Sequence, residues 1–178
     1  NTATSAYAEI VRSAHPELPI VGMEPALKPA HFARHGGKVI VLATDATLRL
    51  QKFERLMSLY GDDVITVVGR GLVELVESGM ARSPEAQSRL EALLSPYRDM
   101  QVDAVVLGCT HYPFLKKAMA QVLGEGVELL DGGEGTARET RRRLLEAGLL
   151  CGEEGDLIVE NSSPDPGKIR LTRQLLET

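Results

Sequence analysis

The chain has 178 residues, of which 43% are hydrophobic and 25% charged, and its formal net charge at pH 7 is -5. These values are typical of a globular chain that is long enough to bury a core. The acidic balance argues against a nucleic-acid-binding protein, and no apolar run reaches the roughly 18 residues that span a bilayer, so no membrane partner is expected. The two cysteines, Cys109 and Cys151, are too few for a disulfide framework and favour a cytoplasmic location.

Short β-branched runs alternate along the chain with longer segments of helical period. In chain order the pattern predicts a helix at 5–15, a strand at 38–43, a helix at 44–60, a strand at 63–68, helices at 71–79 and 83–97, a strand at 102–108, a helix at 113–123, a strand at 127–131, a helix at 134–150, a strand at 156–160 and a final helix. Thr47 and Ser83 are the expected N-caps of two of these helices. The alternation indicates an α/β fold with a mostly parallel sheet flanked by helices.

Ligands of parallel α/β sheets bind at the carboxyl ends of the strands, on the turns that lead into helices. Three such turns carry polar side chains: Thr44 to Thr47, Cys109 to Pro113 and Asp131 to Gly135. The opening "NTAT" has the character of a fourth, because a helical pattern follows it. The purely structural alternatives are that Thr44 and Thr47 only cap a helix and that Asp131 and Gly133 only form a tight turn.

The turn "GCTHYP" combines three reactive side chains in consecutive positions. Cys109 at the start of a helix is expected to have a lowered thiol pKa, because the free N–H groups there favour the thiolate. Thr110 offers a hydroxyl to a carboxylate, and His111 can move a proton. Alternatively, Cys109 is a small buried hydrophobic residue, and His111 is a polar residue whose hydrogen bonds are made within the protein. A zinc site is not expected from one cysteine and one histidine, and Cys151 is interpreted as structural.

"LGCTHYP" closely resembles the second cysteine motif of the glutamate racemases, cofactor-independent enzymes that supply D-glutamate to peptidoglycan. Four further segments resemble motifs of the family in the same order: "NTAT", "VLATDAT", "LVELVESG" and "LLDGGEGTARET". The resemblance therefore covers essentially the whole chain. It implies two similar α/β domains with the active site between them, residues 25–130 forming the second domain, and residues 1–24 and 131–178 belonging to the first. It also implies a homodimer.

The resemblance implies a two-base mechanism in which two cysteine thiols act on opposite faces of the substrate α-carbon. Cys109 carries the step that starts from L-glutamate, assisted by His111. The other site residues that it implies are Asn1, Thr2 and Thr110 on the amino and carboxylate groups, Thr44 beside the pocket, and Glu77 nearby. Glu77 could instead be an exposed helix residue. No metal and no organic cofactor is expected, because neither a ligand set nor a cofactor lysine is recognisable.

The sequence departs from the family at its start, where the first catalytic cysteine is expected immediately before Asn1. The chain is therefore interpreted as the carboxyl-terminal two-thirds of such an enzyme, inactive on its own. Asp45 also stands where the family more often has a small or neutral residue. The alternatives are a related aspartate or hydantoin racemase, and a non-catalytic binding protein derived from the fold.

Overall fold

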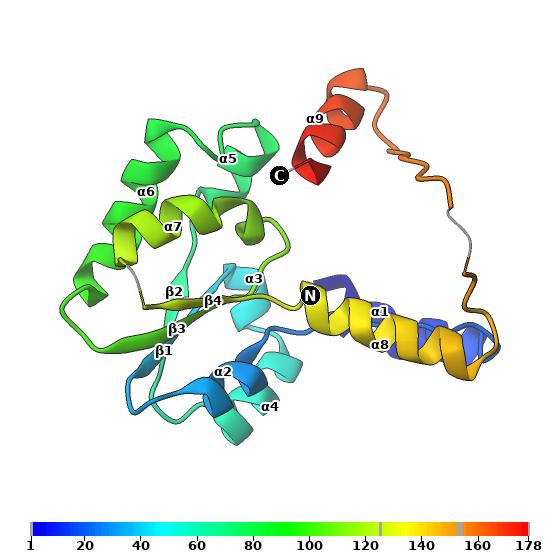
Figure 1. Ribbon diagram of the computed structural model, residues 1–178, viewed down its shortest axis with the longest axis horizontal. Coiled ribbons are helices and arrows are strands. Elements are labelled where there is room, and N and C mark those ends of the chain that lie inside the picture. The colour runs from blue at the N-terminus through cyan, green and yellow to red at the C-terminus, as the bar shows by residue number, and fades with distance from the viewer. Residues whose placement is uncertain (1, 125, 153–154, 178) are drawn as a thin grey trace.

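A four-stranded parallel sheet forms the centre of the computed structural model, which describes residues 2–124, 126–152 and 155–177, with the side chains of α1 described from Tyr7 onward (Figure 1). The strands are β1 (Lys38–Ala43), β2 (Val64–Val68), β3 (Val102–Leu107) and β4 (Glu128–Leu130). Their order is β2-β1-β3-β4, and every neighbouring pair is parallel. The predicted α/β class is confirmed.

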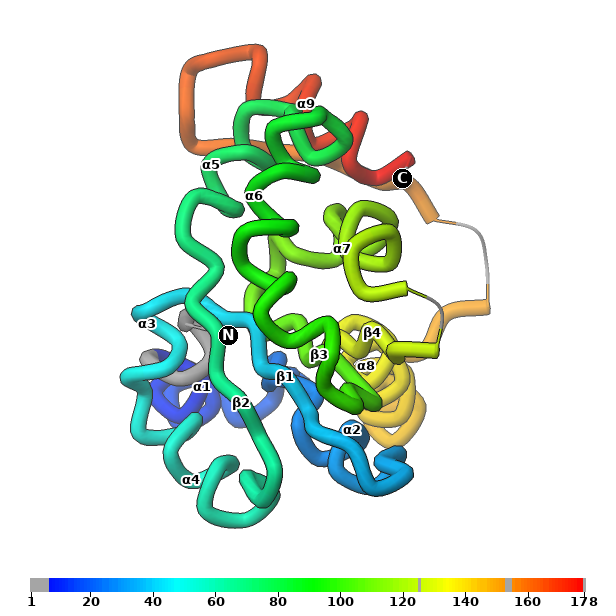
Figure 2. Tube along the Cα trace, turned by 90° about the vertical axis from the view of Figure 1, so that its left-hand side faces the viewer, coloured from blue at the N-terminus to red at the C-terminus, as the bar shows by residue number. Residues whose placement is uncertain are grey.

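Helices cover both faces of this sheet (Figures 1 and 2). On one face lie α5 (Leu72–Glu77), α6 (Pro84–Leu94) and α7 (Lys116–Leu123), with the 3-10 turns η1 (Ser95–Tyr97) and η2 (Tyr112–Leu115). On the other lie α2 (Leu27–Ala33), α3 (Asp45–Leu48) and α4 (Gln51–Tyr60). Beyond the sheet lie α1 (Thr2–Ala14) and α8 (Gly133–Glu146), and α9 (Pro166–Leu176) lies beside α5.

The alternation of side chains along the strands produces two separate cores. In β1, Ile40 and Leu42 pack with the α5–α7 layer, whereas Val39, Val41 and Ala43 pack with the α2 and α4 layer. All five are fully buried. A strand that is covered on both faces reads as a continuous aliphatic run, which explains why "KVIVLA" identifies it from the sequence.

Most predicted elements are confirmed, but three local predictions are wrong. The N-cap after β1 is Thr44, whose Oγ1 accepts a hydrogen bond from the Thr47 backbone at 3.2 Å, and the predicted helix 44–60 is two helices, α3 and α4. Ser83 caps α6 as predicted. The predicted strand at 156–160 is absent, because no described segment pairs with it, and Leu157 and Ile158 are 74% and 79% exposed.

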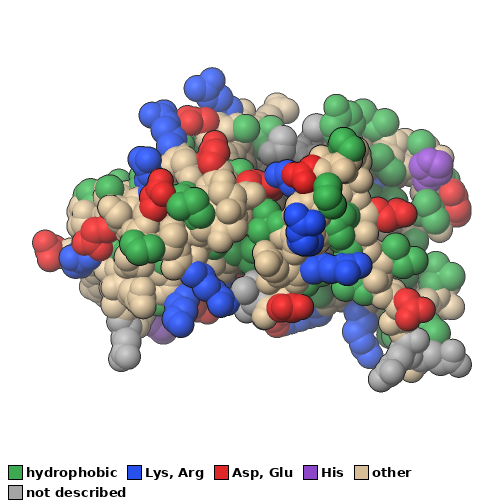
Figure 3. Space-filling view, turned by 90° about the horizontal axis from the view of Figure 1, so that it is seen from above, with side chains coloured by type: hydrophobic (Ala, Val, Ile, Leu, Met, Phe, Trp, Pro, Cys, Tyr) green, Lys and Arg blue, Asp and Glu red, His purple; other side chains and the backbone are tan. Residues whose placement is uncertain are grey.

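The face drawn in Figure 3 carries acidic and basic side chains interspersed with hydrophobic ones. No broad basic area, which a nucleic-acid interface would require, is visible on it. Among the helices of the described ranges, none combines the length and the apolar character needed to cross a membrane.

Two glycines allow close approaches that position the end of β3. A Cβ at Gly108 would lie 2.8 Å from the Cβ of Ala43, so only glycine lets β3 run so close to the end of β1. A Cβ at Gly69 would lie 2.4 Å from the hydroxyl of Tyr112. That space lets the fully buried Tyr112 donate a hydrogen bond to the Gly69 carbonyl at 3.1 Å. The turn after β3 is thereby fastened to the end of β2.

Removing the hydrogen bond between Tyr112 and Gly69 should lower the stability of the protein. We expect Tyr112→Phe to reduce the free energy of unfolding by about 1 kcal/mol, the usual net value of one hydrogen bond. The loss stays small because the Leu72 N–H, 3.3 Å from the Gly69 carbonyl, remains as its donor. Urea unfolding of the complete protein measures the change. Tyr97→Phe is the matched control, since no hydrogen bond of that hydroxyl occurs among the described residues. Equal midpoints for Tyr112→Phe and the wild type would contradict the assignment.

Candidate active site

Cys109 lies at the carboxyl end of β3, at the middle of the sheet's edge. The Gly108 N–H donates to the Leu42 carbonyl at 2.8 Å, so the ladder between β1 and β3 continues up to the residue before the cysteine. Leu42 is paired with Leu107, which places Thr44 and Cys109 on neighbouring strand ends. The polar turns after β1 and β3 therefore meet at one edge, as expected for parallel strands.

A thiol, an imidazole and a carboxylate are in direct contact at this edge. The Sγ of Cys109 lies 3.6 Å from Nδ1 of His111, and Nε2 of His111 lies 2.8 Å from Oε1 of Glu77. Cys109 and His111 come from the same turn, whereas Glu77 comes from the last residue of α5. The structure thus brings together three of the residues that the sequence singled out.

The direction of these hydrogen bonds sets what the histidine can do. An ionised carboxylate only accepts hydrogen bonds, so a neutral His111 carries its proton on Nε2 and donates it to Glu77. Its Nδ1 then has a free lone pair directed at the Cys109 thiol. In this tautomer His111 can take the thiol proton, and Glu77 stabilises the imidazolium that results.

The predicted lowering of the Cys109 pKa is wrong. Burial raises the pKa of the thiol above its ordinary value, and a hydrogen bond from the His111 backbone, which acts in the opposite direction, does not offset it. The physical reason is local: the turn continues into the four-residue 3-10 turn η2, and α7 begins only at Lys116. Cys109 is therefore separated from the N–H groups of a regular helix, and the thiolate needs another source of stabilisation.

Glu77 stays ionised because it has two partners. Lys168, from α9, places its Nζ 2.8 Å from Oε2, the oxygen that His111 does not use. The Lys168 hydrogen bond and then the His111 hydrogen bond lower the pKa of the Glu77 carboxyl. Glu77 is exposed, as expected if it were only a helix surface residue, but it is not isolated, because it contacts both Lys168 and His111. Sequence reasoning missed Lys168, because 91 positions separate it from Glu77 and no local motif marks it.

A cavity of about 250 Å³ adjoins this cluster. Thr110, His111 and Glu77 line one side of it, and α9 supplies the other with Thr172, Leu175 and Leu176. Thr110 is exposed to this space, which agrees with a hydroxyl available to a ligand.

The turn after β1 follows the strand next to β3 and carries a capping threonine and an acidic residue that is paired with an arginine. Thr44 and Thr47 place their hydroxyls 3.0 Å apart, and Thr44 is the residue that caps α3. Asp45 forms an ion pair with Arg70 at 3.3 Å. Its negative charge is thereby partly compensated, which lessens the repulsion that it would exert on an anionic ligand.

The turn after β4 serves a structural purpose. Asp131 accepts a hydrogen bond from the Gly133 backbone at 2.7 Å and pairs with Lys116 at 2.6 Å. Partial burial raises the pKa of Asp131, but Lys116 and the Gly133 N–H outweigh it and lower the pKa overall. Asp131 lines a separate cavity of about 630 Å³ between α2, α4 and α8. Asp131 therefore stabilises the tight turn after β4 and also lines this cavity.

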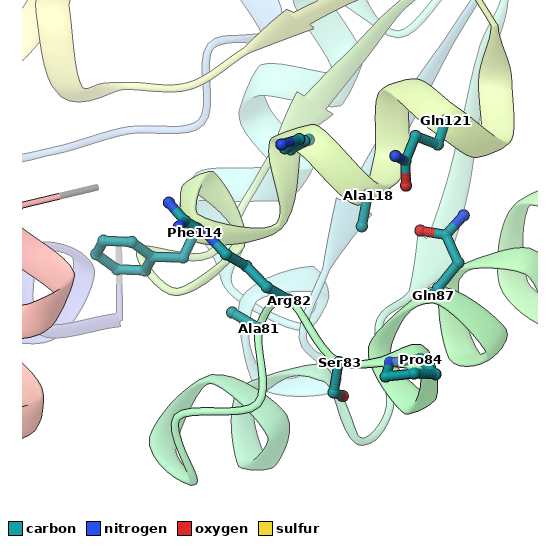
Figure 4. A pocket seen from close by; sticks show the side chains of 9 residues that line it. Ala81, Arg82, Ser83, Pro84, Gln87, Phe114, Ala118 and Gln121 are labelled. Carbon is teal, nitrogen blue, oxygen red and sulfur yellow. The ribbon is translucent and has the colours of Figure 1, made fainter.

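Another cavity, of about 340 Å³, lies between the start of α6 and α7 (Figure 4). Gln87 and Gln121 point toward each other across it, and Arg82 and Phe114 belong to its lining. Phe114 also lines the cavity beside His111, so it separates the two spaces. The lining contains no thiol, imidazole or carboxylate, and its charged side chains are those of Arg82 and Lys117.

The remaining predicted residues are not part of the described cluster. Asn1 and the side chain of Thr2 lie outside the described part of the structure. Cys151, interpreted from the sequence as structural, is free and exposed in the segment after α8. Within the described residues, no group of three or more His, Cys, Asp or Glu side chains is arranged to hold a metal ion.

Comparisons with known proteins identify the family of the chain. The sequence model of the family described as Asp/Glu/Hydantoin racemase matches residues 1–140. A glutamate racemase of Clostridium perfringens (strain SM101 / Type A) is 44% identical over 181 residues, covering 99% of this chain and 70% of the relative. A glutamate racemase of Pseudomonas syringae pv. tomato is 43% identical over 153 residues, covering 85% of this chain and 56% of the relative.

Solved structures share the fold. The Escherichia coli glutamate racemase, in complex with L-glutamate and the activator UDP-MurNAc-ala, matches with a TM-score of 0.74 and 27% identity over 99% of this chain and 68% of that one. The Bacillus anthracis isoform RacE1 matches with a TM-score of 0.70 and 27% identity; the chain spans 57% of its length. The fold and the comparisons define an α/β isomerase. The chain belongs to the Asp/Glu/Hydantoin racemase family.

Proposed function

We propose that the complete protein interconverts L-glutamate and D-glutamate, with Cys109 as one of two catalytic thiols. The observation that carries the proposal is the contact of Cys109, His111 and Glu77 at the end of β3, in a chain whose relatives of about 40% identity are glutamate racemases. Proton removal from the α-carbon of an amino acid needs a base that is held close to that carbon. A thiolate produced by a neighbouring imidazole meets this need.

In the direction that starts from L-glutamate, Cys109 first gives its proton to Nδ1 of His111. This transfer is required because burial raises the thiol pKa, so that the thiol does not ionise readily by itself. The imidazolium is stabilised by Glu77 through Nε2. The Cys109 thiolate then takes the α-proton, and the carbanion receives a proton on its opposite face from the second thiol. In the reverse direction the two thiols exchange their roles.

The second thiol is the cysteine that the motif resemblance places immediately before Asn1. In this proposal Asn1, Thr2 and Thr110 hold the amino and carboxylate groups of glutamate, and Thr44 borders the pocket. Residues 25–130 form one α/β domain, and residues 1–24 and 131–178 belong to the other. A domain boundary near residue 130 is supported by the end of β4 at Leu130.

The cellular setting is proposed from the same resemblance. The complete protein supplies D-glutamate for peptidoglycan, acts in the cytoplasm and assembles as a homodimer. A reducing compartment is supported by the two cysteines, which are both free in the structure.

The proposal is tested by incubating the purified complete protein with L-glutamate, and separately with L-aspartate and a substituted hydantoin. We expect loss of optical activity only with glutamate, ending at equal amounts of the enantiomers because they have equal free energy. Chiral chromatography of the products measures this. Racemisation of aspartate or of the hydantoin alone would replace the proposal by that related activity, and binding of glutamate without turnover would favour a non-catalytic protein.

A further inference from the structure

We propose that Lys168 of α9 is a positioning residue of the Cys109 site, which holds Glu77 in the orientation that His111 requires. This inference rests on the proposed racemase function and adds a residue that the sequence motifs do not mark. The contacts form one continuous series from α9 to the thiol: Lys168 to Glu77, Glu77 to His111, and His111 to Cys109.

The carboxylate of Glu77 is shared between the two partners. Lys168 binds Oε2 and His111 binds Oε1, each at 2.8 Å. The Glu77 side chain stands at the end of α5 and is 44% exposed, so packing alone does not fix its rotamer. Removing the lysine would free the carboxylate to rotate toward solvent. The role of the ion pair is thus orientation, since exposed ion pairs contribute little to stability.

One face of α9 is directed at the site. Lys168, Leu171, Thr172 and Leu175 follow the i, i+3, i+4, i+7 spacing of one helical face. Leu171 lies against the turn at Gly79, where its Cδ1 would be 3.6 Å from an added Cβ. Thr172 and Leu175 line the cavity beside His111, and Leu175 also packs against the core. Figures 1 and 2 both show α9 next to α5.

Electrostatics supports the same role. Lys168 is the largest cause of the lowered pKa of Glu77, and the pKa of Lys168 is raised in turn, first by its hydrogen bond to Glu77. Both groups therefore stay charged near neutral pH. His111 accordingly always faces an ionised acceptor, which keeps its Nε2 protonated and its Nδ1 free for the thiol.

A purely structural role for Lys168 is the alternative, in which the ion pair only fastens α9. The two roles predict different results when substitutions of Lys168 and Glu77 are combined in one protein. A lysine that acts through Glu77 loses its effect when Glu77 can no longer be held as a carboxylate, whereas independent effects multiply.

The test uses the complete protein and L-glutamate. We expect Lys168→Met to lower kcat about 10-fold with little change in KM, because misplacing a catalytic group weakens the chemical step. Lys168→Arg should retain most of kcat, since a guanidinium can still bind one carboxylate oxygen. In a Glu77→Gln background, Lys168→Met should cause no further loss. Arg170→Met is the matched control: it removes one positive charge from the same helix, and Arg170 has no ion pair among the described residues.

Melting temperatures of all variants verify folding. A kcat for Lys168→Met equal to that of Arg170→Met would overturn the inference, and so would losses that multiply in the Glu77→Gln background. If Lys168→Met fails to fold, the kcat values of Lys168→Arg and Lys168→Gln are compared with that of Arg170→Met in the same way. A wild-type protein that does not racemise glutamate would instead refute the proposed function, so the two failures are distinguishable.

Discussion

Cys109→Ser should reduce racemisation of glutamate in both directions by about 10⁴-fold, the upper end of what positioned acid–base groups contribute. In the proposed mechanism one thiol acts as the base and the other as the acid in each direction, so loss of either would stop the reaction. A serine hydroxyl is far too weak an acid for His111 to convert it near neutral pH into a standing alkoxide that could serve as the base. The substitution also removes little volume, so the turn after β3 should keep its structure.

The matched control for this variant is Cys151→Ser. Cys151 is the other free cysteine and is exposed in the segment after α8, so its replacement should leave turnover unchanged. Initial rates from L-glutamate and from D-glutamate, measured by chiral chromatography, compare the two variants. Near-wild-type turnover by Cys109→Ser would refute the catalytic assignment, and loss in both variants would point to a general need for thiols.

His111→Asn should lower kcat by about 10²-fold with L-glutamate and by less with D-glutamate. The asymmetry follows from the cluster. In the proposed mechanism, Cys109 must lose its proton when L-glutamate is the substrate, and Nδ1 of His111, 3.6 Å from Sγ, is the proton acceptor. When D-glutamate is the substrate, Cys109 starts as the protonated acid, which its raised pKa already favours.

Thermodynamics constrains this result. Because the enantiomers have equal free energy, kcat/KM must remain equal in the two directions, so the unequal change in kcat is offset in KM. A histidine that only stabilised the turn would lower the melting temperature and leave the kinetic constants of the folded fraction unchanged. His35→Asn, at an exposed histidine after α2, is the control. Equal changes of kcat in both directions would refute the proposal that His111 assists Cys109.

Local patterns were sufficient to predict most of the fold. The aliphatic runs at 38–43 and 102–108 identify buried strands because helices cover both faces of the sheet. The prediction fails at 156–160, where the run has the composition of a strand but no described neighbour to pair with. Strand formation depends on a partner, and the sequence of one segment does not contain it.

The sequence could predict contacts of the candidate site only between residues that are close to each other along the chain. Cys109 and His111 lie on one turn, so their contact follows from the motif itself. Glu77 was implied by the family resemblance, whereas Lys168 reaches the site only through the placement of α9. The direction of the Cys109 pKa shift could not be read from the pattern, because it depends on burial and on the 3-10 geometry of η2.

Exchange of the α-proton of L-glutamate in D₂O tests most directly whether Cys109 is the base for that enantiomer. Proton NMR of L-glutamate with the complete wild-type protein should show loss of the α-proton signal as deuterium is incorporated. With Cys109→Ala, whose side chain carries no acid or base, the signal should persist even though the second thiol remains. Loss of the α-proton at the wild-type rate in Cys109→Ala would contradict the account, because another group would then remove that proton.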